Sequence, residues 1–241
     1  MARYIMYFIM GNSILLEKLK EHGIYRSFAL LFLSSVFSLF VLALRMAFTG
    51  TYRYMFLNWN LFLAAVPWVV TTILLLYPGI AARRIRFALL LLVWLLFLPN
   101  APYIITDLLH LNYWNGPNVW FDLVLIFSYA WTGLMFGFFS IINMESILSK
   151  SFSTKVINVI SSVALFACGF GIYLGRYARW NSWDIIQSPF SLIADIADRF
   201  IHPFDHPRTW AMTILVGILL NIIYFSMKPV RNQKNIYAGN T

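Results

Sequence analysis

The chain has 241 residues, of which 61% are hydrophobic and 11% are charged, and its mean hydropathy is +0.73. These values exclude an ordinary soluble domain and indicate an integral membrane protein. The formal net charge is +9, but the basic residues flank apolar segments and form no dense basic stretch. This distribution argues against nucleic acid as a partner and is typical of the positive-inside pattern of membrane proteins.

Residues 1–26 are predicted to be a cytoplasmic or interfacial N-terminal segment. Apolar residues recur on one helical stripe from Ile5 to Leu19, and charged residues such as Lys18 lie off that stripe. This pattern is typical of a helix in the membrane interface. A small-residue cleavage site followed by a soluble domain is not apparent, so we do not interpret the segment as a signal peptide.

Six apolar segments follow, and together they predict an all-α, polytopic membrane helical bundle over residues 27–227. A helix needs about 20 residues to cross about 30 Å of hydrocarbon. Residues 228–241 are predicted to be a cytoplasmic tail. The predicted spans are 27–48, 57–77, 87–105, 119–142, 156–175 and 209–227.

The third span is the most informative, because its apolar run is too short to cross a membrane. Phe87 to Leu98 is 12 residues, which rise only ~18 Å as a helix. The path must therefore continue through Pro99, Asn100 and Pro102, which predicts a helix broken at Pro99–Pro102. Irregular backbone at membrane depth is tolerated only inside protein or beside a water-filled cavity. A simple structural kink is the alternative interpretation.

The basic residues orient the spans. Twelve of the 18 Lys and Arg residues lie before the first span, between the second and third, between the fourth and fifth, or after the last. This distribution predicts that both termini are cytoplasmic and that the longest loop, 176–208, faces outward. Within that loop, Ser188-Pro189 and the apolar spacing after it predict a short amphipathic helix over 189–201, on the outer membrane surface.

Counting along the predicted helices places polar residues from separate spans in one layer near the outer face. Ionisable residues at that depth are costly unless they are paired or solvated. Two arginines and two aspartates in one layer therefore predict a polar pocket. The residues of the layer are Arg45, Asn58, Asn60, Asn100, Asp107, Asp122 and Arg176. Snorkelling of Arg45 and a helix N-terminal role for Asp122 are the simpler alternatives.

Two stretches concentrate the candidate residues. In a helix that starts at Pro102, four side chains share one face, and the helix N-terminus near Asn100 suits an anion. Those four are Tyr103, Thr106, Asp107 and His110. The second stretch is GRYARWNSWD, in which Arg176, Arg179 and Trp183 are expected on one helical face with Trp180 beside them. Arginine binds phosphate or carboxylate, whereas tryptophan stacks on sugar rings or lies at the headgroup level.

These patterns predict the candidate site residues. For acid–base chemistry the candidates are Asp107, His110, Asp122 and Asp184, because a carboxylate or imidazole can relay a proton. For substrate binding the candidates are Arg45, Asn100, Tyr103, Thr106, Arg176, Arg179, Trp180, Asn181 and Trp183. His202, Asp205 and His206 form a compact set that matches no strong zinc motif, so neither a metal site nor a cofactor is predicted.

The leading functional interpretation is a membrane protein whose outer pocket binds an anionic or polyol headgroup. One alternative is a hydrolase or transferase that acts on an outer-leaflet lipid or lipid-linked substrate. A transporter and a non-catalytic scaffold are further alternatives, although the apolar inner halves of the spans argue against a through-going pore. The expected partners are the lipid bilayer and an anionic or lipid-linked ligand.

The run FLPNAPYIITDLLHL, followed later by GRYARWNSWD, resembles a bacterial family of multi-pass membrane proteins catalogued as a domain of unknown function. The resemblance extends over about residues 27–227. It implies a bacterial plasma-membrane protein and brings no activity, catalytic residue or cofactor with it. Its two motifs, LPNxPYxxTDLxHL and GRxxRWNSWD, coincide with the polar layer that counting along the spans predicts.

Overall fold

A computed structural model describes residues 17, 19–20, 23–111, 119–180 and 183–238, with the backbone alone for 229–238. In these ranges every regular element is a helix. Six helical segments are long and apolar enough to cross a membrane. They are α2 (Tyr25–Thr49), α3 (Phe56–Leu76), a composite third segment (Arg84–His110), α7 (Val119–Leu148), α8 (Thr154–Arg176) and the part of α11 (Pro207–Ala238) that ends at Lys228. The predicted all-α polytopic bundle is confirmed.

The third segment changes its winding where the two prolines interrupt it. Helix α5 (Arg84–Phe97) ends just before Pro99, α6 (Asn100–Tyr103) is a single turn, and the 3-10 helix η1 (Ile104–His110) completes the segment. Proline lacks a backbone N–H and cannot continue the i to i−4 ladder. The Ala101 N–H bonds the Leu98 carbonyl three residues back, whereas the Tyr103 N–H bonds the Pro99 carbonyl. The predicted break is confirmed.

Helix α7 lies at the centre of the bundle and packs against α2, α3, α6, η1 and α8. Small polar side chains join it to its neighbours inside the core. The Thr132 hydroxyl bonds those of Ser34 and Ser38 on α2, at 2.7 and 3.3 Å. On the broken segment, the indole N–H of Trp94 donates to Ser140 on α7. Such hydrogen bonds between helices are a common means of holding transmembrane bundles together.

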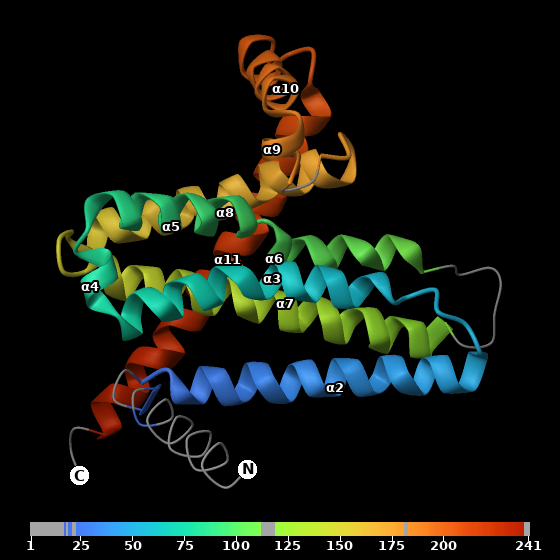
Figure 1. Cartoon of the computed structure of the whole chain (residues 1–241), viewed down its shortest axis with the longest axis horizontal. Helices are drawn as coiled ribbons and strands as arrows, with labels where there is room; N and C mark the ends of the chain where they lie inside the picture. The colour runs from blue at the N-terminus through green and yellow to red at the C-terminus, as the bar shows by residue number, and fades with distance from the viewer. Residues whose placement is uncertain (1–16, 18, 21–22, 112–118, 181–182, 239–241) are drawn as a thin grey trace, which may run out of the picture.

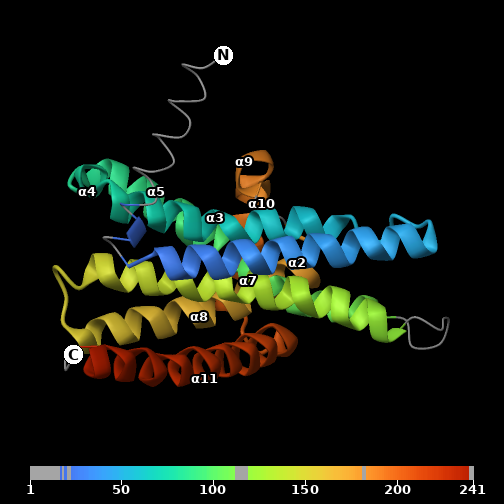
Figure 2. The ribbon, with the colours of Figure 1, turned by 90° about the horizontal axis from the view of Figure 1, so that it is seen from below.

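Most of the long helices lie along one axis, α11 crosses them obliquely, and a short helical pair projects from the side (Figure 1). Figure 1 shows α2, α3 and α7 side by side along that axis, and Figure 2, turned by 90°, shows α8 and α11 beside them. The short helices α9 (Asp184–Gln187) and α10 (Pro189–Ile201) project from the bundle near the end of α8. The start of α2, the short helix α4 (Pro78–Ala81) and the end of α11 lie toward the opposite end.

Candidate functional site

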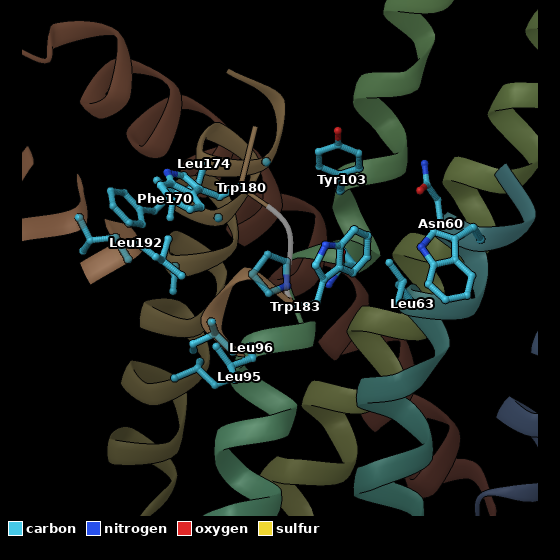
Figure 3. A pocket seen from close by; sticks show the side chains of 18 residues that line it. Asn60, Leu63, Leu95, Leu96, Tyr103, Phe170, Leu174, Trp180, Trp183 and Leu192 are labelled. Atoms are coloured by element: carbon cyan, nitrogen blue, oxygen red, sulfur yellow. The ribbon is translucent and has the colours of Figure 1, made fainter. Parts of the chain in front are cut away.

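A cavity of about 460 Å³ lies between α3, the broken third segment, α8 and the α9–α10 pair. Figure 3 shows Leu95 and Leu96 on one side of Trp183, with Tyr103 and Asn60 on the other. This volume is within the range of small-molecule sites in proteins. Among the described residues that line it, none carries a charge. The polar and aromatic members of the lining are Trp59, Asn60, Asn100, Tyr103, Phe170, Trp180 and Trp183.

Two glycines of α8 allow the broken segment to form a wall of this cavity. A Cβ atom added to Gly171 would lie 2.6 Å from the Cβ of Pro99, and one added to Gly175 would lie 3.0 Å from the Tyr103 ring. Gly171 and Gly175 are four residues apart, which is the small-residue spacing that permits close approach of transmembrane helices. The prolines are therefore packed against protein, as irregular backbone at membrane depth requires.

A buried ion pair lies beside the cavity wall. The Asp107 side chain is 1% exposed, and its Oδ1 is 2.5 Å from Nη2 of Arg176 on α8. Its second oxygen accepts a hydrogen bond of 2.8 Å from the amide Nδ2 of Asn60 on α3. Asn60 also lines the cavity. The pair thus joins the third segment to both α3 and α8, with its charges balanced.

The four residues that the sequence predicts on one face all contact the Arg176 guanidinium. Thr106 Oγ1 accepts hydrogen bonds from Nε and Nη2, at 3.0 and 2.7 Å. The Tyr103 ring centroid is 4.7 Å from the guanidinium carbon, and His110 Nε2 is 3.2 Å from Nη1. Arginine has donors only, so His110 Nε2 is the acceptor in this contact.

The face that carries Tyr103, Thr106, Asp107 and His110 was expected on an α-helix, but most of it lies on the 3-10 helix η1. Residues three apart are eclipsed in a 3-10 helix. The spacing from Tyr103 to Thr106 and from Asp107 to His110 therefore brings each pair into line on η1 and its preceding turn.

Arg45 and Asp122 form a second ion pair that does not line the cavity. Nε and Nη2 of Arg45 on α2 donate to the two Asp122 oxygens on α7, at 2.5 and 3.3 Å. Tyr54, in the α2–α3 loop, donates its hydroxyl to Asp122 at 3.0 Å. Burial, followed by this hydrogen bond, raises the pKa of Tyr54. The structure thus separates the two arginines and two aspartates of the predicted layer into two ion pairs, because α2 contacts α7.

The GRYARWNSWD stretch does not continue α8, so Arg176, Arg179 and Trp183 do not share a helical face. The helix ends at Arg176, where the N–H groups of Tyr177 and Ala178 both bond the Tyr173 carbonyl. Arg179 is exposed and has a φ of 62°. Asp184 begins α9 and is not part of the cavity lining. Asn181 lies outside the described residues.

The turn that follows α8 brings two tryptophans into the cavity wall. The Trp183 ring centroid is 6.4 Å from that of Trp59 on α3. Trp180 donates its indole N–H to Asp195 on α10 at 2.6 Å, and Asp195 is paired with Arg199. Trp59, Leu192 and Ile196 are lining residues that the sequence interpretation missed. Trp59 had an available signal, because it directly precedes Asn60 in the predicted layer.

The histidines after α10 are bound to an aspartate of that helix. His202 Nδ1 and His206 Nε2 lie 2.8 and 2.7 Å from the two oxygens of Asp198. These hydrogen bonds, that of His202 first, lower the pKa of Asp198 below its ordinary value. Of the predicted compact set, His202 and His206 thus bind Asp198. The His206 contact links α10 to the residue that precedes α11.

Comparison with known families identifies the chain at the family level. A family model described as a protein of unknown function, DUF1361, matches residues 59–223. Neither the curated proteins nor the solved structures gave a match. The matched range is more than half of the chain, and it contains every residue that lines the cavity together with Asp107 and Arg176. Arg45 and Tyr54 precede it. The chain therefore belongs to the DUF1361 family of proteins of unknown function.

Proposed function

We propose that this multi-pass membrane protein binds the headgroup and upper chain of an amphiphilic lipid or lipid-linked molecule. The observation that carries the proposal is the cavity of about 460 Å³ between the broken third segment and the α9–α10 pair. Ligand sites of this kind are concave and mostly apolar, with a few polar groups that fix orientation. The lining has that composition, since two asparagines and a tyrosine interrupt its apolar and aromatic wall.

The arrangement of the lining supports an amphiphile rather than a fully polar ligand. Leu95 and Leu96 lie at one side of Trp183, whereas Asn60 and Tyr103 lie at the other (Figure 3). A hydrocarbon chain would contact the leucines, and a headgroup would lie among the indole, amide and phenol groups. Tryptophan and tyrosine combine apolar surface with a hydrogen-bonding group, which suits the boundary between chain and headgroup.

Binding is better supported than acid–base catalysis by Asp107 and His110. Both oxygens of Asp107 already accept hydrogen bonds, from Arg176 and Asn60. His110 Nε2 accepts from Arg176. A general base must reach the proton it removes, and the Asp107 side chain is only 1% exposed and does not line the cavity. The contacts of these two side chains instead hold the third segment in place, with the charges compensated.

Retention of a bound amphiphile tests the proposed function. Ala167 lines the cavity, and the substitution Ala167→Phe would fill part of it. We expect this variant to retain at least tenfold less native amphiphile than the parent chain, when lipids are counted by mass spectrometry after purification in a detergent without a sugar headgroup. The matched control is Val163→Phe, on the same helix at a position that is 61% exposed. Equal retention in both variants would contradict the proposal.

We further propose that the protein lies in a bacterial plasma membrane with both termini in the cytoplasm. The basic residues between spans support this orientation. With Cys168→Ala as background, we expect Asp205→Cys to react with an impermeant maleimide in right-side-out vesicles. Lys150→Cys should react only after permeabilisation. Both positions are exposed. The parent chain is the control, because Cys168 is 1% exposed and should stay unlabelled. The reverse labelling pattern would contradict the proposed orientation and show that both termini lie outside the cytoplasm.

A further inference from the structure

We infer that the headgroup bound in this cavity is a neutral sugar or a similar ring polyol, and that a phosphate or carboxylate headgroup is excluded. The inference rests on the proposed function, because it names the chemical class of the ligand for the same cavity. Three features of the described site support it: the charge of the lining side chains, the bonding of Arg176, and the exposure of two lining tryptophans.

The first feature is the uncharged lining. An anion buried in a mostly apolar wall loses hydration, and it needs a cation or several donors to compensate. Among the described lining residues the polar groups are the Asn60 and Asn100 amides, the Tyr103 hydroxyl and the indole N–H groups of Trp59 and Trp183, because the N–H of Trp180 is donated to Asp195. Amides and hydroxyls pair well with neutral hydroxyl groups, since each side supplies both donors and acceptors. The lining therefore matches a polyol better than an anion.

The second feature is that Arg176, which directly follows the lining residue Gly175, is already engaged. The Arg176 guanidinium donates to Thr106, to Asp107 and to His110, and it lies over the Tyr103 ring. The Asp107 carboxylate neutralises the charge of Arg176, and the Asp107 side chain is 1% exposed. An anionic headgroup that bound to Arg176 would have to displace that carboxylate, which would leave it buried without its charged partner. Such a state is strongly unfavourable.

The third feature is a pair of exposed tryptophans in the lining. Trp59 and Trp183 line the cavity with ring centroids 6.4 Å apart and planes tilted by 55°. The two residues are 52% and 38% exposed, and Trp59 also stacks on Phe62. The C–H face of a pyranose ring is flat and apolar, so it stacks on an indole while its hydroxyls point to the rim. The Asn60 Nδ2 donates a hydrogen bond to Asp107, so its Oδ1 can accept one from a ligand hydroxyl.

A competition experiment tests the headgroup class. The full chain is placed in nanodiscs with equal amounts of monoglucosyl diacylglycerol, phosphatidylglycerol and diacylglycerol that share the same acyl chains. Bound lipid is then counted by native mass spectrometry. We expect the glucosyl lipid to be retained at least tenfold more than either competitor. Preference for phosphatidylglycerol, or equal retention of all three, would overturn this inference while leaving the proposed amphiphile site intact. Retention of none would refute the proposed function itself.

Tryptophan variants locate the effect in the cavity. Trp183→Ala is expected to lower retention of the glucosyl lipid about tenfold, whereas Trp183→Phe, which keeps a ring face, should retain most of it. The matched control is Trp131→Ala, since Trp131 is an exposed tryptophan of α7 outside the cavity lining. Equal losses for Trp183→Ala and Trp131→Ala would assign the selectivity to the membrane surface and overturn the inference.

Discussion

Replacing Asp107 by asparagine is expected to lower the free energy of unfolding by about 3 kcal/mol or more, because the variant leaves the Arg176 charge without its partner. Asp107 is 1% exposed, and it binds Arg176 on α8 and Asn60 on α3 through its two oxygens. Burying a charge away from water is costly, and when Asp107 is replaced the Arg176 charge keeps this desolvation penalty without a compensating partner. Thermal unfolding of the detergent-solubilised protein, followed by circular dichroism, measures the loss.

A double replacement separates the structural role of this pair from a catalytic one. With Asp107→Leu and Arg176→Met together, no charge is left unpaired, so we expect most of the lost stability to return. Asp198→Asn is the control, because Asp198 also bonds two side chains through its two oxygens but is 51% exposed. Its replacement should change stability little. If Asp107→Asn unfolds at the parent temperature, the buried pair is not a structural element and the acid–base alternative regains its support.

The fold class follows from the sequence because the bilayer imposes strong constraints on it. Each span must satisfy its backbone polar groups internally, so six apolar segments predict six helices. The same reasoning predicts the break at Pro99 and Pro102, since the run from Phe87 to Leu98 cannot cross the hydrocarbon alone. In the structure the segment continues as far as His110.

The grouping of the polar side chains could not be predicted, because depth along a helix says nothing about its rotation. Counting residues places Arg45 and Arg176 at one level, and only packing decides which carboxylate each of them meets. Arg45 meets Asp122 because α2 packs on α7, whereas Arg176 meets Asp107 because α8 packs on α6, directly before η1. Spacing rules for a continuous helix also failed after Arg176, where α8 ends and Arg179 takes a positive φ.

The cavity was harder to predict than the ion pairs because most of its lining is apolar. Residues such as Leu96, Leu192 and Ile196 resemble ordinary membrane-facing residues in the sequence, and only tertiary packing directs them to a shared space. The sequence does carry one usable signal for the wall of the cavity. Gly171 and Gly175 have the spacing that allows a close approach of helices, and they lie opposite Pro99 and Tyr103.

That close approach predicts the second large effect. Gly171→Ala should lower the free energy of unfolding by about 1–3 kcal/mol, because the added methyl group must push apart two packed segments. The new Cβ would lie 2.6 and 2.7 Å from Cβ and Cγ of Pro99, and a proline ring cannot rotate away as a flexible side chain would. Displacement of α6 would also move Tyr103 and Asn100 in the cavity wall, so retention of the bound amphiphile should fall together with the unfolding temperature.

Gly79→Ala is the matched control for this variant. A Cβ atom at Gly79 meets nothing within 4 Å, and alanine favours helix over glycine, so the α4 variant should be at least as stable as the parent. Both variants carry the same chemical change, and they differ only in whether the methyl group has space. An unfolding temperature for Gly171→Ala equal to that of Gly79→Ala would mean that α6 and α8 are not in contact at Pro99. The broken segment would then not form a wall of the cavity.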